Sequence, residues 1–134
     1  LVKEMEEAIK NKDIEKISYL AEFDSLFLHA VTETGYKHLI YREPESLVLY
    51  KALYKMRNYE VIPEKVKEKG GFPAWISWDT GPSSFINLNR KFVDEFFMKL
   101  NKEIKLLNYE IKLPKPIISS VGGGVSKTNK HIVF

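Results

Sequence analysis

The sequence predicts an α+β fold in which an antiparallel sheet is covered by helices. Three observations support this fold class. Segments with apolar residues at helical spacing alternate with short apolar runs, and a turn containing glycine and proline joins two of those runs like a hairpin. A long amphipathic segment over residues 90–108 carries an aromatic stripe that needs an apolar sheet face. The 134 residues suit a single domain, residues 1–134.

Four helices are predicted in the N-terminal half, and their ends follow from capping and breaking residues. Asp13 is the expected N-cap of the second helix, and Asp24-Ser25 is the expected start of the third. Gly35 ends the third helix, and Pro44 opens the fourth. The helices are predicted over residues 2–10, 13–21, 24–35 and 44–57.

Short apolar runs predict the strands. We expect the sheet to contain residues 74–79, 84–88 and 116–121, with further short extended pieces at 39–41 and 131–134. Residues 60–72 are charged and contain Pro63 and Gly70-Gly71, which predicts a loop or a partly helical insertion. Residues 90–108 form the strongest helix, and its stripe around Phe96 is expected to cover one sheet face together with the N-terminal helices.

Composition excludes several classes of protein. The chain has no cysteine, which removes disulfide frameworks, thiol nucleophiles and Cys-based zinc sites. No apolar run approaches the ~20 residues of a membrane-spanning helix, and no signal-peptide pattern is present. The net charge of +3 is too mild to imply a nucleic-acid partner. We expect a cytoplasmic protein without membrane or nucleic-acid partners, and a chain that starts within a helix of a longer protein.

Asp79 is the first candidate for chemistry. It ends a predicted buried strand and precedes Thr80, Gly81 and Pro82. A carboxylate at the end of a rigid strand can point into a cleft, whereas Asp before Gly-Pro is also common turn chemistry. Both interpretations stand on spacing alone.

The remaining candidates are weaker. A glycine run follows the last predicted strand; it could cradle phosphate, but no apolar helix follows, so a loop between strands is favoured. Four late lysines either face a phosphorylated ligand or form a solvated tail. The three histidines lack metal-ligand spacing, so no metal site is predicted, and the first is interpreted as a core or interface histidine. These residues are Gly122, Gly123 and Gly124; Lys112, Lys115, Lys127 and Lys130; and His29, His38 and His131.

Four segments in order resemble the C-terminal domain of mevalonate diphosphate decarboxylases, in the GHMP kinase superfamily. Residues 24–30 resemble the family's Asp-Ser-x-x-x-His-Ala helix, and Tyr41 with Ser46 matches its Tyr-x-x-x-x-Ser segment. Residues 75–83 are similar to a strand ending in Asp-Ala-Gly-Pro-Asn, and residues 121–129 resemble a late Val-Gly-x-Gly-Pro-x-x-Thr-Asn segment. The resemblance covers about residues 5–133.

The resemblance implies a function. Enzymes of this family use ATP to phosphorylate the tertiary 3-hydroxyl of a phosphorylated mevalonate, then lose phosphate and carbon dioxide to give an isopentenyl product for isoprenoid biosynthesis. The catalytic aspartate falls on Asp79, with Thr80 and Gly81 as substrate-binding residues. ATP and Mg²⁺ are expected to bind mainly to an N-terminal domain that has no counterpart in these residues, and a homodimer is expected. Thr80 and Ser83 replace the family's Ala and Asn.

Two alternatives remain. A mevalonate 3-kinase relative would phosphorylate without decarboxylating, but such kinases lack the aspartate that Asp79 supplies. A stand-alone phosphate- or nucleic-acid-binding module would use the basic C-terminal strip and would bind with steep salt dependence.

Overall fold

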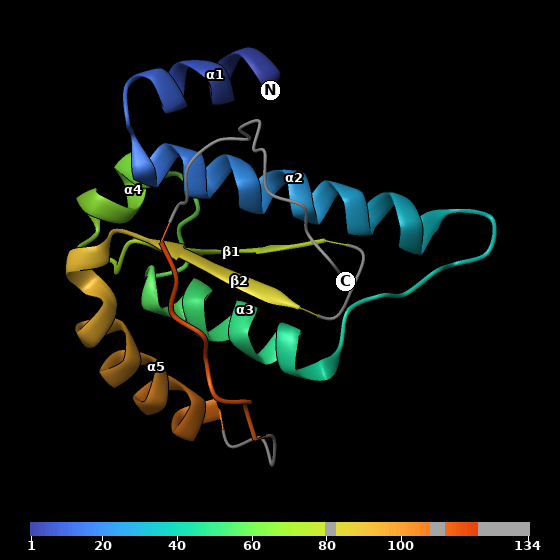
Figure 1. Ribbon diagram of the computed structural model, residues 1–134. Helices are drawn as coiled ribbons and strands as arrows, with labels where there is room; N and C mark the ends of the chain where they lie inside the picture. Colours follow the sequence, from blue (N-terminus) through green and yellow to red (C-terminus); the bar gives the residue numbers. More distant parts are fainter. Residues whose placement is uncertain (80–82, 108–111, 121–134) are drawn as a thin grey trace, which may run out of the picture.

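The computed structural model describes residues 1–79, 83–107 and 112–120. Helices surround a two-stranded antiparallel sheet (Figure 1), which confirms the predicted α+β class. No helix in the described part of the chain is long and apolar enough to cross a membrane. The elements are α1 (Val2–Lys10), α2 (Ile14–Thr34), α3 (Pro44–Met56), α4 (Pro63–Glu68), β1 (Ala74–Trp78), β2 (Ser84–Leu88), the 3₁₀ turn η1 (Arg90–Phe92) and α5 (Val93–Leu107).

The sheet is the predicted hairpin, with Ala74 opposite Leu88 and Trp78 opposite Ser84. The predicted third strand is wrong for residues 116–120, which have no regular structure, and residue 121 lies outside the described part. Pro116 has no N–H to donate to a ladder. The extended piece at residues 39–41 is not a strand either. The piece at 131–134 lies outside the described residues.

The two helices predicted at 13–21 and 24–35 are one continuous helix, α2. Asp13 caps it as expected, because its side chain accepts a hydrogen bond from the Lys16 N–H. Ser25 does not start a new helix. Its hydroxyl is 2.9 Å from the Ala21 carbonyl oxygen, one turn earlier, so the polar side chain is satisfied within the helix. The other helix predictions are confirmed, and the 60–72 insertion is partly helical through α4.

The apolar core lies between one sheet face and the helices α3 and α5. Phe96 is 3% exposed, which confirms the predicted packing of its stripe. Of the N-terminal helices expected on this face, α3 covers it, whereas α2 lies along the outer edge of β1 (Figure 1) and, of its described residues, only Leu26 packs against this core. The buried members of the core are Ala52, Leu53, Met56, Phe72, Ala74, Ile76, Trp78, Phe96 and Leu100.

Candidate functional site

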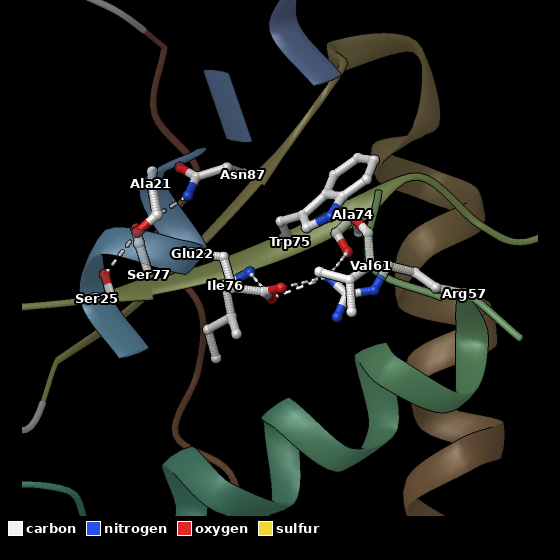
Figure 2. A network of polar contacts seen from close by, with 10 residues as sticks. All are labelled: Ala21, Glu22, Ser25, Arg57, Val61, Ala74, Trp75, Ile76, Ser77 and Asn87. Atoms are coloured by element: carbon white, nitrogen blue, oxygen red, sulfur yellow. Dashed lines mark hydrogen bonds and ion pairs between the residues drawn. The ribbon is translucent and has the colours of Figure 1, made fainter. Parts of the chain in front are cut away.

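The outer edge of β1 has no neighbouring strand in the described structure, and side chains take its place. In an antiparallel ladder, the N–H and C=O groups of alternate residues point to opposite edges. Ile76 N–H donates to Glu22 Oε1 at 3.0 Å, and Trp78 N–H donates to Ser25 Oγ at 3.0 Å. The Ala74 carbonyl accepts from Arg57 Nη1 at 3.3 Å (Figure 2). Polar side chains from α2 and the end of α3 therefore complete this strand edge.

The spacing of the α2 residues explains the match. Glu22, Ser25 and His29 lie at positions i, i+3 and i+7, which share one helix face. Seven residues of helix span about 10.5 Å, and the three steps of strand from Ile76 to Asp79 span about 10 Å. One face of α2 can therefore place a polar group beside Ile76, beside Trp78 and beside Asp79, which follows β1.

Glu22 and Arg57 form a buried ion pair at this edge. Their side chains are 1% and 0% exposed, and Arg57 Nη1 donates to both carboxylate oxygens at 2.9 Å. The guanidinium lies 5.6 Å from the centre of the Trp75 ring, a cation–π distance. Burial raises the pKa of the nearby Tyr50 hydroxyl, and the Glu22 charge raises it further.

Sequence reasoning missed this ion pair. The available signal was an acidic residue, Glu22, at the helical spacing of Ser25 and His29. That spacing alone does not name Arg57, which lies 35 residues later. Only the fold shows that the two charges meet.

Asp79 follows the last residue of β1 and is exposed. Its carbonyl oxygen accepts a hydrogen bond from His29 Nε2 at 3.1 Å. The His29 ring is 1% exposed and meets Trp78 edge to face, with the ring centres 5.9 Å apart. The backbone that carries the Asp79 side chain is thus held by α2.

The other side of the turn is held by α3. Trp78 Nε1 donates to Ser84 Oγ at 2.8 Å, and Ser84 Oγ donates to Ser46 Oγ at 3.0 Å. Ser46 is 2% exposed and lies in the first turn of α3. Three residues singled out by the family resemblance, Ser25, His29 and Ser46, therefore converge on the two strand ends that flank residues 79–83.

A groove of about 810 Å³ opens beside Asp79. Its walls come from α1, α2 and the end of the hairpin, and they are mainly apolar. Ser25, Ser77 and Asp79 are among its polar residues. Asp79 therefore borders a concave surface, as the strand-end interpretation requires.

Several other candidate residues lie away from this groove, and others lie outside the described residues. His38 is exposed in the loop after α2, with its ring bonded to the Glu33 carbonyl. Lys112 and Lys115 are exposed. In residues 1–79, 83–107 and 112–120, no three His, Cys, Asp or Glu side chains gather as a metal site would need. Outside the described residues lie Thr80, Gly81, Pro82, Gly122, Gly123, Gly124, Lys127, Lys130 and His131.

Comparison with known proteins identifies relatives of this hairpin and its helices. No family model matches the chain. The chain is 33% identical over 93 residues to phosphomevalonate decarboxylase of Haloferax volcanii, which covers 69% of this chain and 26% of that protein. The mevalonate diphosphate decarboxylase from Enterococcus faecalis has a similar structure, with a TM-score of 0.62, 22% identity, and coverage of 75% of this chain and 28% of that one. The chain is thus similar in sequence to part of a phosphomevalonate decarboxylase and similar in fold to part of a mevalonate diphosphate decarboxylase.

Two further structures agree on the fold. MDDEF in complex with MVAPP, AMPPCP and magnesium gives a TM-score of 0.62 at 22% identity, and MDDEF in complex with MVAPP gives 0.58 at 23%. Each match covers 75% of this chain and 28% of the other. The chain therefore spans about a quarter of the length of these relatives.

Proposed function

We propose that this chain is the aspartate-bearing part of an ATP-dependent decarboxylase that acts on a phosphorylated mevalonate. One observation carries the proposal. Asp79 is an exposed carboxylate residue at the end of β1, beside a groove, and its backbone is held by the family-like residues of α2. The relatives supply the reaction class, since they are decarboxylases of phosphorylated mevalonates.

In this proposal, Asp79 serves two steps. Its carboxylate accepts a hydrogen bond from the 3-hydroxyl of the substrate, and so orients that oxygen or takes its proton as the phosphoryl group is transferred. When the 3-phosphate leaves, C3 gains positive character, and a fixed carboxylate nearby stabilises it. Thr80 and Gly81, next in the chain, are proposed to contact the substrate.

We assign the binding of ATP and Mg²⁺ to another part of the enzyme. The described residues do not fit a magnesium site, because no cluster of three acidic or histidine side chains occurs among them. We propose that an N-terminal domain of the same enzyme binds both, and that the enzyme is a cytoplasmic homodimer. The 134-residue chain by itself should show no saturable ATP binding by calorimetry. Tight binding would contradict this division of labour.

Asp79→Asn in the complete enzyme tests the proposal. Asn keeps the volume and the turn hydrogen bonds but cannot take a proton. We expect kcat of ATP-dependent carbon dioxide release to fall by about 10²–10⁴-fold, with stability within about 1 kcal/mol of the parent. Asp94→Asn, at an exposed aspartate in the first turn of α5, is the matched control and should keep normal turnover.

Near-normal turnover of Asp79→Asn, together with normal melting, would show that Asp79 is a turn residue only. The same assay separates the two family chemistries. ATP consumption without carbon dioxide release by the parent enzyme would indicate a 3-kinase. Nucleic-acid binding with steep salt dependence would instead support the stand-alone module.

A further inference from the structure

His29 is the most deeply buried polar ring near Asp79, and only one of its two ring nitrogens has a hydrogen-bond partner among the described residues. It is 1% exposed, and its Nε2 bonds to the Asp79 carbonyl oxygen. Its other ring nitrogen, Nδ1, is buried and has no hydrogen-bond partner among the described residues. Because a carbonyl oxygen only accepts, Nε2 must carry the proton.

This arrangement is unfavourable for stability alone. A buried nitrogen without a partner costs free energy, whereas an apolar ring of similar shape would not carry that cost. The edge-to-face contact with Trp78 could be made equally well by phenylalanine. What histidine adds at this position is the single hydrogen bond to Asp79. Residues that break a local stability rule in this way are expected at functional sites.

We propose that His29 is a positioning residue that fixes the Asp79 backbone, and so sets where the Asp79 carboxylate meets its substrate. This inference rests on the proposed function of Asp79. Two other polar groups of α2 act earlier in the chain: Glu22 bonds to Ile76, three residues before Asp79, and Ser25 bonds to Trp78, one residue before it. His29 is the α2 side chain with a hydrogen bond to the reactive residue itself.

The first test needs no activity. In the 134-residue chain labelled with ¹³C and ¹⁵N, long-range ¹H–¹⁵N spectra distinguish which ring nitrogen of a histidine is protonated. We expect the proton on His29 Nε2, and we expect His29→Phe to shift the ¹³C resonance of the Asp79 carbonyl. His38→Asn, at an exposed histidine, serves for assignment and should leave that resonance in place. A proton on Nδ1, or an unchanged Asp79 carbonyl in His29→Phe, would overturn the inference.

The second test uses the complete enzyme. His29→Phe keeps the ring contact and removes the donor, and His29→Gln keeps a donor on a side chain of similar reach. We expect His29→Phe to lower kcat by about 10²-fold, as a small misplacement can, with little change in KM and no loss of melting temperature. His29→Gln should recover most of kcat. If His29→Phe lowers the melting temperature, His29→Gln separates stability from positioning. A His29→Gln variant with the parent's melting temperature but without the parent's kcat would overturn the inference.

The two proposals fail differently. If Asp79→Asn keeps its turnover, the proposed function is wrong, whatever happens at His29. If Asp79→Asn is inactive while His29→Phe turns over normally, the function stands and the positioning role is wrong.

Discussion

The face and the outer edge of β1 are held by opposite kinds of contact. On the face, Ile76 and Trp78 pack against Phe96, Leu100 and their apolar neighbours. On the edge, the contacts with α2 are polar and directional, at 3.0–3.1 Å. Apolar burial stabilises without choosing a direction, whereas hydrogen bonds require particular atoms to meet. The comparison indicates that the face supplies stability and the edge supplies position.

The contacts along this edge also stabilise and protect the small sheet. A two-stranded hairpin is marginal alone, and an open strand edge invites pairing with other chains. Here α2 lies along that edge and bonds to it (Figures 1 and 2). The strand that carries Asp79 is thereby fixed on both sides.

Phe96→Ala should have the largest effect, because it empties the apolar face. A buried Phe replaced by Ala costs about 3–5 kcal/mol through lost burial and a cavity. Chemical denaturation followed by circular dichroism measures this loss. Met98→Ala on the same helix is the control, since Met98 is 70% exposed and should change stability by less than about 0.5 kcal/mol. Similar losses for the two variants would contradict the assignment of the core.

Glu22→Gln should come next, because it leaves the Arg57 charge buried without a counter-charge. Gln can still accept from Ile76 N–H. We therefore expect the free energy of unfolding to fall by about 3 kcal/mol, the lower end of the cost of breaking a buried ion pair. The double variant Glu22→Gln/Arg57→Met should recover part of it.

Glu33→Gln is the matched control for the ion pair. Glu33 lies on the same helix and pairs with Arg42, but these side chains are 24% and 21% exposed. A pair that solvent reaches contributes about 1 kcal/mol or less. Equal losses of stability for Glu22→Gln and Glu33→Gln would show that the buried Glu22–Arg57 pair stabilises the fold no more than the partly exposed Glu33–Arg42 pair.

Ser25→Ala should be milder. It leaves the Trp78 N–H without its partner at a buried edge, which costs about 1–3 kcal/mol. Ser18→Ala is the control, because Ser18 is equally buried but bonds only within its helix, to the Ile14 carbonyl at 2.7 Å. If both variants unfold at the same denaturant concentration, the contact of Ser25 with β1 contributes nothing measurable.

The pH dependence from Tyr50 should be the smallest effect. Its pKa is raised in the fold, first by burial and then by the Glu22 charge. An unfolded tyrosine ionises near pH 10. The contribution to stability is therefore complete below about pH 10 and is lost as pH rises through the higher folded pKa.

Tyr50→Phe should flatten this alkaline loss when melting temperatures are compared across that range. Tyr36→Phe, at a 99% exposed residue, should leave the profile unchanged. A parent profile identical to that of Tyr50→Phe would show that the fold does not raise the Tyr50 pKa.

Local patterns predicted much of this fold. The hairpin at 74–79 and 84–88 follows from apolar runs around a Gly-Pro turn, and α5 follows from the spacing of its aromatic stripe. The order of the family-like segments also singled out Ser25, His29, Ser46 and Asp79 before the fold was known. The hairpin and α5 depend on residues close in sequence, so spacing predicts them, whereas the four site residues came from the family resemblance.

The tertiary structure decided the rest. The two predicted helices merge into α2, in which Ser25 bonds to the Ala21 carbonyl and to Trp78 of β1, 53 residues away. The predicted strand at 116–120 did not form although it contains Ile117 and Ile118, because a strand needs a partner and Pro116 cannot donate a ladder hydrogen bond. The Glu22–Arg57 pair joins charges 35 residues apart. Sequence spacing determines which side of an element is polar, but only packing determines which polar groups meet.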